Sequence, residues 1–585
     1  MSQAQAEGNT QGFWGIVTAQ FLGAFNDNAL RWFLIALSLK EISKESRRAQ
    51  TIALASALFL LPYLIFSMHA GALADRYSKR TVLMWSKAAE AAVMALCLGG
   101  LLLGTDFNWI LPLLLGALFL LGTQAAYYSP AKFGVLPEIL PERRLSWGNG
   151  IFEMTGVIAI ILGSACGSAF VGIFHDRLYL APAVFVGVAL LGLLATWFVP
   201  PLPAADPDSP PMKAVTALIA QGRKLARHRI LLLTLIAVVY IWSLGLLFQL
   251  NIALYAKQIL LLEESKVGNA MAVAAIGVAL GNISAGYLSG KTIEMGLVPF
   301  ASLGLGLTSM ALYFTQATVA CTYGCVAILG FFAGLFIVPT HALLQEESPV
   351  EDKGGIWAAT NFFQTLGMLV ASGIFVVLEN GLSLSPPEIF LVCGIGTLAT
   401  GAVLMAILPE ALGRTMVWLS ARLWLPVKVA GQENVPARGP ILFVVEGKPR
   451  KEGFFLLAGT RRFVQFVLPE AATRGLWARS LARALRFIPL RGEPPGDGIS
   501  AAAERIAASL GQGGAISIFD GSLRDSAQPP RSGGDPLLPS LRILNDAGGV
   551  VVPVEVVPAP SGRGFRVTFG KPRSHIVPSE GSPEP

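Results

Sequence analysis

Charged residues are scarce in this sequence. Asp, Glu, Lys and Arg make up only 14% of the 585 residues, whereas a soluble globular protein carries about 25%. Hydrophobic residues reach 53%, and the mean hydropathy is +0.60. So low a charge content excludes an ordinary soluble protein over most of the length and indicates a membrane protein.

Cysteine and histidine are also few, with five of each. The cysteines all fall inside apolar runs, and none forms a C-x-x-C pair: Cys97, Cys166, Cys321, Cys325 and Cys393. We therefore expect small hydrophobic residues of membrane spans rather than disulfides or zinc ligands, with no metal site and no cofactor. Residues 1–11 have no basic stretch, so the sequence does not predict a cleavable secretory signal.

Long apolar runs are what the sequence has in abundance. Each of the recurring runs is long enough to cross a bilayer of about 30 Å. We expect twelve spans, at 13–38, 52–73, 82–104, 108–128, 149–173, 180–199, 231–255, 267–290, 297–316, 318–343, 355–378 and 388–408. The proline-rich stretch 200–212 separates the sixth span from the seventh, and a six-plus-six plan is typical of a duplicated transporter.

Lysine and arginine in the short loops predict the orientation. The basic clusters at 75–80, 141–144 and 222–229 fall on one side of the membrane. We therefore expect that side to be cytoplasmic and both termini to lie on it. The loop 40–48 is an exception, because its basic residues fall on the other side.

The sequence changes character after residue 409. Residues 411–585 hold 22 Lys and Arg against 14 Asp and Glu, while the preceding 410 residues hold 22 against 23, so the basic excess is C-terminal. Strand-like runs alternate there with helix-like stretches such as 501–510, and the runs lie at 441–445, 515–519, 550–557 and 565–570. This alternation predicts an α/β domain. Its charge favours contact with anionic lipid headgroups, and an ordinary soluble surface that happens to be basic is the alternative.

Acidic residues occur inside the spans, where a charge is costly and usually faces a cavity or a partner. The acids are Asp27, Glu90 and Glu153, and the nearby cations at span ends are Arg31 and Lys132. Asp27 and Arg31 are four residues apart on one helical face, so a purely structural salt bridge is one interpretation. The asparagines on either side of Asp27 favour another, a polar cavity between the two halves that binds a zwitterionic headgroup or a coupling ion.

The loop after the second span reads GALADRYSKR, residues 71–80. This pattern resembles the loop signature of the major facilitator superfamily, and GYLSGK at 286–291 is a weaker repeat of it. A glycine permits a tight helix end, and the acid and bases can bridge helix ends in one conformation and release them in another. We therefore predict a conformational gate, formed by Gly71, Asp75, Arg76, Lys79 and Arg80.

Four further strings, in order along the chain, resemble the bacterial lysophospholipid transporter family, a branch of that superfamily. They are TAQFLGAFNDNAL (18–30), AAYYSPAKFGVLPEI (125–139), GNGIFEMTGVIAIILGSACG (148–167) and FIVPTHALLQE (336–346). The resemblance covers residues 12–408. It implies a twelve-helix major facilitator fold that moves lysophospholipids from the outer to the inner leaflet of the cytoplasmic membrane, where they are re-acylated. A generic solute or drug efflux carrier of the superfamily is the alternative.

The matching strings also imply a substrate-binding set, which is Asp27, Asn28, Lys132 and Glu153. Gln249 in the seventh span is included in the set, although it departs from the family pattern. We expect some relatives to carry a cation at this position. Headgroup preference is therefore expected to differ if that cation contacts the lipid phosphate. A lipid substrate suits the small number of charges, since a cavity needs to hold only the headgroup while the acyl chain stays in hydrocarbon.

The C-terminal part resembles the glycerophosphate acyltransferase family. The resemblance rests on four blocks in order, VKVAGQENVPARGPILFVVEG (427–447), RFIPLRGE (486–493), SIFDGSLRDS (517–526) and VVPVEVV (551–557). Active members need N-H-x-S-x-x-D, in which the histidine is the general base. Here residues 446–452 read EGKPRKE, with Gly447 at the histidine position and Glu452 at the aspartate position, and Asp520 replaces the glutamate of the third block.

Glycine cannot accept a proton, so we expect the domain to be a pseudo-enzyme. The resemblance implies that it keeps a lipid-phosphate surface of Arg491, Arg524 and Lys448. A bifunctional transporter and acyltransferase that uses an unusual base is the alternative. The expected partners are a lysophospholipid substrate, membrane lipids and a separate acyltransferase or acyl-carrier-protein system, with no nucleic acid.

Together these patterns predict a multi-pass protein of the bacterial inner membrane. It is expected to be α-helical in the membrane, with a cytoplasmic α/β acyltransferase-like domain at its C-terminus. The expected boundaries are an N-terminal tail 1–11, a first six-helix half 12–199, a cytoplasmic linker 200–229, a second six-helix half 230–408, an interfacial connector 409–426, the acyltransferase-like domain 427–575 and a disordered tail 576–585.

Overall fold

The computed structural model divides into two compact units, Met1–Gly401 and Ala402–Pro585. The structure describes residues 9–104, 106–207, 214–262, 264–289, 293–314, 318–407, 427–436, 439–445, 453, 455–456, 459–460, 462, 464–469, 487–490, 504–506, 508–511, 514–519, 549–558 and 565–573. Each unit has its own core and is considered by itself.

Long helices form the first half of the first unit. In the described part of the chain they are α2 (Thr10–Glu41), α3 (Glu45–Arg76), α4 (Lys79–Leu103), α5 (Phe107–Ile139), α6 (Glu142–Ile173) and α7 (Leu180–Thr196). The side chain of Asn9 caps α2 by accepting a hydrogen bond from the Gly12 amide at 2.7 Å. An apolar chain in hydrocarbon must satisfy its own backbone groups, which is why these runs become helices.

A second set of helices forms the other half. It consists of α9 (Arg229–Gln258), α10 (Glu264–Ser289), α11 (Leu297–Phe314), α12 (Val319–Glu347), α13 (Lys353–Val376) and α14 (Pro386–Ile407), with a 3-10 turn η1 (Val350–Asp352) before α13 and a π-helical turn η2 (Val377–Gly381) after it. Each predicted span corresponds to one helix of the two halves. Within the described residues, ten of these twelve helices meet the length and hydropathy expected of a membrane span. The other two are α2, which is not among the ten, and α7, which has only 17 residues. The chain is therefore a multi-pass membrane protein, and its five cysteines are free.

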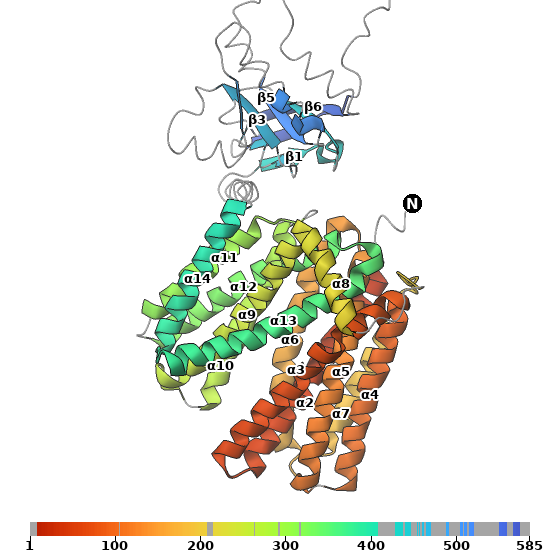
Figure 1. The fold of residues 1–585 in the computed structure, drawn as a ribbon, viewed down its shortest axis with the longest axis vertical. Coiled ribbons are helices and arrows are strands. Elements are labelled where there is room, and N and C mark those ends of the chain that lie inside the picture. The colour runs from red at the N-terminus through yellow and green to blue at the C-terminus, as the bar shows by residue number, and fades with distance from the viewer. Residues whose placement is uncertain are drawn as a thin grey trace, which may run out of the picture. The chain divides into compact units, whose positions relative to one another are not determined.

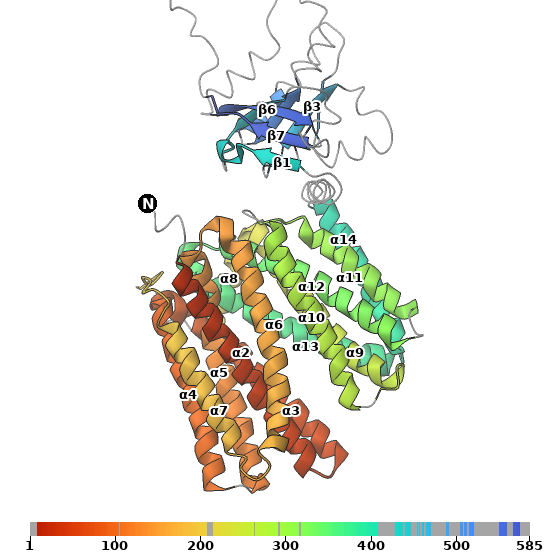
Figure 2. The ribbon, with the colours of Figure 1, turned by 180° about the vertical axis from the view of Figure 1, so that it is seen from behind.

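Figures 1 and 2 show the two halves as a red-to-golden bundle, α2–α7, and a yellow-green-to-teal bundle, α9–α14. Between them in sequence lies α8 (Ala214–Arg227), inside the segment that the sequence predicts only as a linker. Ala217 and Leu225 of α8 are buried, with Leu218 packed beside them, while Lys224 is exposed. The helix forms because its apolar residues fall on one face, which packs on α3, α9 and α13.

One apolar core joins the two halves. The first half contributes residues such as Leu83, Phe133 and Leu145, and the second contributes Leu344 and Trp357. Leu83 and Leu145 lie near the starts of their helices and Phe133 and Leu344 near the ends, so all are at the end of the bundle that adjoins α8. We call this the closed end, because both halves contribute to a single buried core there.

The opposite end of the first half has a separate core. Its members include Phe33, Cys97, Leu114 and Phe185, and all of its residues come from α2–α7. We call this the far end. Within the described residues, the cores therefore connect the halves at the closed end, whereas the far-end core belongs to one half.

The second unit contains a seven-stranded sheet in its described residues. The order is β1-β7-β6-β2-β5-β3-β4, with β1 (Val427–Ala430), β2 (Ile441–Val445), β3 (Val464–Pro469), β4 (Ile488–Leu490), β5 (Ala515–Phe519), β6 (Val550–Pro558) and β7 (Phe565–Phe569). All neighbours are parallel except β6 and β7. Strand β5, which lies in the interior of the sheet, is buried along its whole length, as expected of a parallel strand covered on both faces.

The four strand-like runs predicted from the sequence are β2, β5, β6 and β7. The positions predicted for the acyltransferase-like site all lie outside the described residues. They are Gly447, Lys448, Glu452, Arg491, Asp520 and Arg524. The strands themselves define a separate domain without identifying its family.

Candidate functional site

A network of polar side chains lies inside the first half. Its most deeply buried member is Asn26 on α2, which is 0% exposed. The Asn26 amide donates to Glu90 Oε1 at 3.0 Å and to the carbonyl oxygen of Phe185 at 3.1 Å. Asn26 thus ties α2 to α4 and α7, which explains one of the two asparagines beside Asp27 as a structural residue.

Glu90 is held by a second partner, Lys87. The Lys87 ammonium lies 2.7 Å from Glu90 Oε2, and both side chains are 1% exposed. It also lies 4.9 Å from the centre of the Tyr128 ring. Burying both charges is tolerable only because they are paired and hydrogen-bonded. Sequence reasoning included Glu90 and missed Lys87, although Lys87 is three residues earlier on the same helical face.

Asp27 does not form the salt bridge with Arg31 that its helical spacing permits. Arg31 instead donates to Asn28 Oδ1 at 2.7 Å and lies 5.7 Å from the Phe59 ring centre. The Oδ1 atom of Asp27 is buried and has no hydrogen-bond partner among the described residues. The carboxylate lies within electrostatic range of Lys87, Lys132, Arg31 and Glu90. Asp27 is therefore surrounded by charge of both signs without being neutralised by one direct partner.

Lys132 on α5 has an aromatic environment. Its ammonium lies 4.9 Å from the ring centre of Phe133 and 5.8 Å from those of Tyr128 and Phe152. Its recorded hydrogen bond goes to an amide oxygen, Gln20 Oε1, at 3.1 Å. No carboxylate of the described residues lies within ion-pair distance of it. Lys132 is thus a cation held in place by ring faces and an amide, with capacity to bind an anion.

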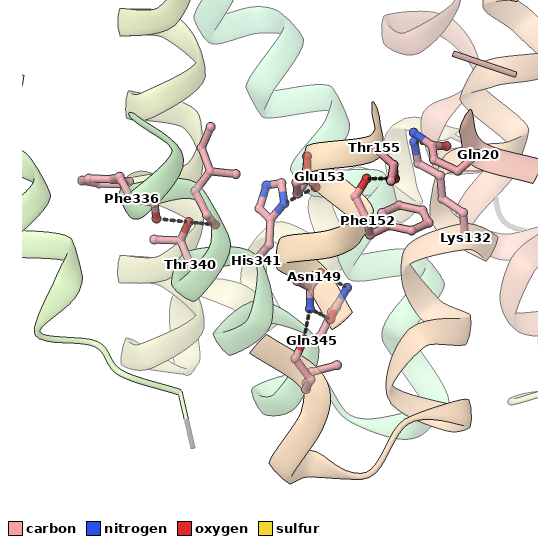
Figure 3. A network of polar contacts seen from close by, with 12 residues as sticks. Gln20, Lys132, Asn149, Phe152, Glu153, Thr155, Phe336, Thr340, His341 and Gln345 are labelled. Carbon is pink, nitrogen blue, oxygen red and sulfur yellow. Dashed lines mark hydrogen bonds and ion pairs between the residues drawn. The ribbon is translucent and has the colours of Figure 1, made fainter. Parts of the chain in front are cut away.

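Glu153 on α6 reaches the other half of the bundle. Its Oε1 lies 3.0 Å from Nδ1 of His341 on α12. Four residues earlier on α6, Asn149 exchanges two amide hydrogen bonds with Gln345, at 2.6 and 3.1 Å. Figure 3 shows these two pairs one above the other, with Lys132 and Gln20 beyond Phe152. Sequence reasoning assigned His341 no role, although a histidine inside an apolar span is as costly as the acids that it did consider.

The structure thus gathers three predicted site residues in one region. Lys132 lies within electrostatic range of both Asp27 and Glu153. Asn28 is turned to its own helix, where its amide donates to the Ala24 carbonyl oxygen at 2.8 Å. Gln249 is exposed on α9 and is not part of this network. No group of three or more His, Cys, Asp or Glu that could hold a metal occurs in the described part of the chain.

The predicted gate lies at the closed end, and two of its residues contact the other half. The Asp75 carboxylate accepts hydrogen bonds from the backbone amides of Gly354 and Gly355, both at 2.7 Å. These amides begin α13, where a helix attracts negative charge. A Cβ on Gly71 would lie 2.5 Å from the Cβ of Ala358 and 2.8 Å from the Gly354 oxygen. Glycine is therefore required for α3 and α13 to approach so closely.

The basic residues of the predicted gate contact their own half. Lys79 is fully buried and forms an ion pair with Glu138 at 2.5 Å. Arg80 donates to the carbonyl oxygen of Trp197 at 3.1 Å and covers its ring, while Arg76 is exposed. Lys353, from the second half, is within electrostatic range of Glu138.

Comparison with known proteins gives a consistent assignment for the membrane unit. The profile of the Major Facilitator Superfamily matches residues 16–372. The chain is 28% identical to the lysophospholipid transporter LplT of Serratia proteamaculans over 367 residues. The aligned region covers 62% of this chain and 86% of that protein. It is also 28% identical over 400 residues to LplT of Klebsiella pneumoniae, covering 67% and 94% of the two chains.

Solved structures with the same fold are more distant in sequence. The fucose:proton symporter FucP of E. coli superimposes with a TM-score of 0.55 at 12% identity, covering 68% of this chain and 99% of that one. The proton:xylose symporter XylE superimposes with a TM-score of 0.53 at 15% identity, and the match covers 68% of this chain and 96% of that one. These likenesses concern the fold of the membrane unit.

Proposed function

The chain belongs to the Major Facilitator Superfamily, and on this premise we propose that it moves lysophospholipids from the outer to the inner leaflet of the bacterial inner membrane. The observation that carries the proposal is the position of Lys132. It is a cation without a direct carboxylate partner among the described residues, and it lies within electrostatic range of both Asp27 and Glu153. A phosphate on Lys132 and an amine near Asp27 would together match a zwitterionic headgroup.

The surroundings of this region favour a lipid over a sugar or a peptide. The charged residues of the network are few, and apolar cores lie at both ends of the first half. Such a site recognises a headgroup and leaves an acyl chain in apolar surroundings, which is the arrangement that a lysolipid needs. The names of the two LplT relatives support the same substrate class. A generic solute or drug carrier of the superfamily is the competing proposal.

We identify the closed end with the cytoplasmic side, because the basic segments 75–80, between α3 and α4, and 222–229, at the end of α8, lie there. Both termini are then cytoplasmic, and the state described has its cytoplasmic end shut. In this proposal the gate consists of two contacts between α3 and α13. Asp75 of α3 binds the backbone amides of the first turn of α13, and Gly71 of α3 allows the two helices to approach closely. Passage of a lipid to the inner leaflet requires both contacts to separate.

For the second unit we propose a lipid-binding pseudo-enzyme that acts beside a separate acyltransferase. β2 pairs in parallel with β5, β5 with β3, and β3 with β4. The carboxyl ends of these strands therefore lie at the same edge of the sheet. Directly after these strands in sequence come three predicted positions or blocks, 446–452, Arg491 and Asp520. Sites of open parallel sheets form at that edge. The missing histidine, with Gly447 in its place, is the reason for expecting binding without acyl transfer.

The testing experiment uses purified full-length protein in liposomes. Labelled lysophosphatidylethanolamine is added to the outer leaflet, and its loss from albumin back-extraction is followed with and without acyl donors. We expect translocation by the native protein and a rate about tenfold or more lower for Lys132→Gln, because a hydrogen bond to a charged group contributes about 1.5–3 kcal/mol. Lys40→Gln, at the exposed end of α2, is the matched control and is expected to keep the native rate.

The outcomes separate the competing functions. Absence of translocation by the native protein would favour the generic carrier. Formation of diacyl lipid by the native protein would contradict the pseudo-enzyme proposal and favour the bifunctional enzyme.

A further inference from the structure

One polar pair lies on the outer surface of the membrane unit rather than inside it. Nδ1 of His69 on α3 and Oη of Tyr127 on α5 are 2.6 Å apart, and the two rings meet edge to face with their centres 5.6 Å apart. His69 is exposed, and Tyr127 is partly exposed. Within the described residues, the structure shows no other hydrogen bond from either side chain. The pair is therefore open toward the surroundings of the protein.

The residues along the same helical faces show what those surroundings are. Ile65 and Leu61 precede His69 at steps of four residues and are 47% and 42% exposed. On α5, Leu120 lies two turns before Tyr127 and is 45% exposed. Exposed apolar stripes of this kind on membrane helices face acyl chains. The pair is thus a polar exception on a lipid-facing surface, where unmatched polar groups are costly.

The depth of the pair in the bilayer follows from its place on α3. His69 lies seven residues before Arg76, where α3 ends, which is about 10 Å along the helix. The headgroup region on each side of the apolar core is about 5–8 Å thick. With the closed end on the cytoplasmic side, the pair lies just inside the level at which headgroups give way to chains. The glycerol part of an inner-leaflet lipid is found near this level.

The hydrogen-bonding capacity of the pair is only partly used. An uncharged imidazole has one N–H group and one accepting nitrogen, and a phenol has one O–H group and an accepting oxygen. If Tyr127 donates to Nδ1, the Nε2–H group of His69 is left over. If Nδ1–H donates instead, the O–H group of Tyr127 is left over. In either arrangement, one donor and one acceptor remain for a group outside the protein.

A hydroxyl group matches this remainder, because it accepts one hydrogen bond and donates another. A lysophospholipid has a free hydroxyl on its glycerol, whereas a diacyl phospholipid has an ester there, which can only accept. Water is scarce at this depth. The chemistry of the pair therefore fits the feature that distinguishes a lysolipid from the lipids around it.

We propose that His69 and Tyr127 form a lipid-facing binding site for the free glycerol hydroxyl of a lysophospholipid. This inference rests on the proposed transport function and adds to it. The region around Lys132 recognises a headgroup, which lysolipid and diacyl lipid share, while the pair recognises the hydroxyl. His69 is two residues from Gly71 on α3, so the site holds lysolipid beside the gate in preference to the diacyl lipids of the inner leaflet.

The experiment reports on the lipid that lies next to the pair. Ile65→Cys carries a fluorophore in the full-length protein without native cysteines, reconstituted in phosphatidylethanolamine bilayers. Its quenching is titrated with three nitroxide-labelled lipids, which are lysophosphatidylethanolamine, the analogue without the glycerol hydroxyl, and diacyl phosphatidylethanolamine. A neutral hydrogen bond corresponds to about a 2- to 13-fold change in affinity. We expect the lysolipid to associate about fivefold more strongly than either of the others.

Two variants and a second label position test the origin of this preference. His69→Phe and Tyr127→Phe each keep an aromatic ring, and each should make the three lipids equivalent. Tyr127→Phe removes a single oxygen atom, so it tests the pair even if His69→Phe does not fold. A fluorophore at Leu190→Cys on α7, where the native side chain is 52% exposed, is the matched label and should show no preference.

Three results would overturn the inference. They are equal quenching at Ile65→Cys by the lysolipid and its analogue, a preference that persists in Tyr127→Phe, and stronger association of the diacyl lipid, which would assign the pair to a bulk membrane lipid. None of these measurements requires lipid to cross the bilayer. The transport function is therefore judged separately, by the back-extraction assay on the native protein.

Discussion

The two ends of the first half are built differently. At the closed end, residues of both halves share one core, and polar contacts cross it at Asp75, Asn149 and Glu153. At the far end, the core comes from α2–α7 alone. The first kind of core can be divided without unfolding either half, whereas the second can be lost only by unfolding the half itself. Substitutions at the two ends should therefore be distinguishable by what they change.

The polar contacts of the closed end suit an interface that opens repeatedly. A carboxylate on a helix terminus and a pair of amides can each exchange partners with water when they separate. The directly contacting α3 and α13 backbones leave no room for side chains at Gly71. These contacts therefore align the two halves specifically at the closed end while keeping the free-energy cost of separating them small.

The largest effect is expected inside the first half, where the Lys87–Glu90 pair is buried. Lys87→Met leaves a buried carboxylate without its cation, at a cost of about 3–5 kcal/mol in folding free energy. The thermal unfolding temperature of the detergent-solubilised protein should fall strongly, and the double variant Lys87→Met, Glu90→Met should recover much of the loss. Lys40→Met at an exposed position is the control. A stable Lys87→Met protein would show that the pair does not stabilise the half.

The second effect concerns opening rather than folding. Gly71→Val places atoms where Ala358 and the Gly354 oxygen now lie, and such overpacking costs about 1–3 kcal/mol. The closed end should open while each half stays folded. Distances between spin labels at the closed ends of α4 and α11, in a background without native cysteines, measure this population.

Gly99 on α4 provides the matched glycine, because a Cβ there would meet no atom within 4 Å. Gly99→Val should leave the distance distribution unchanged. An unchanged distribution in Gly71→Val would mean that the close approach of α3 and α13 does not limit closure.

A smaller shift in the same direction is expected from Asp75→Asn. The substitution keeps an acceptor but removes the negative charge from the start of α13, which is worth about 0.3–2 kcal/mol. The same spin-label pair should show a partial increase in the open population. Asp176→Asn, in the exposed His175–Asp176 pair after α6, removes an equal charge and should have no such effect. Equal shifts in the two variants would attribute the result to net charge.

The smallest effect is expected at the surface of the closed end. Lys224 of α8 contacts Asp352 at 2.6 Å, but its side chain is 53% exposed. Exposed ion pairs contribute about 0.2–1 kcal/mol, so Lys224→Gln should change the open population slightly, and added salt should produce a similar change in the native protein. A shift as large as that of Gly71→Val would identify α8 as a main determinant of closure.

The spans were predictable because each is a continuous local signal. The apolar length of a run determines a membrane helix regardless of its neighbours, and the helices agree with the runs. The helix α8 was not predicted, because its 14 residues are too short for a span, are interrupted by polar and basic residues, and are buried only through contact with α3, α9 and α13. In the second unit, the strands β2, β5, β6 and β7 were predictable from their apolar β-branched runs, while β1, β3 and β4 were not distinguished.

The candidate site was predictable only in part. Asp27, Lys132 and Glu153 were found as charges in or near apolar spans, and the structure places them in one region. Helical spacing permits a salt bridge between Asp27 and Arg31, which was one of two interpretations, whereas the fold places Arg31 against Asn28 and Phe59. The contact of Glu153 with His341 joins residues 188 positions apart. No local pattern specifies such a pair, because it depends on how two halves of the chain pack.

The sheet of the second unit has a consequence for the order in which the protein is made. β1, its first strand, pairs with β7, its last, with Val427 aligned with Phe565. A ribosome delivers β1 long before β7 exists, so that edge must wait unpaired until nearly the whole unit has been synthesised. A chain that stops before β7 would leave β1 without its neighbour and expose an edge of β6, whereas the helices of the membrane unit would already be complete.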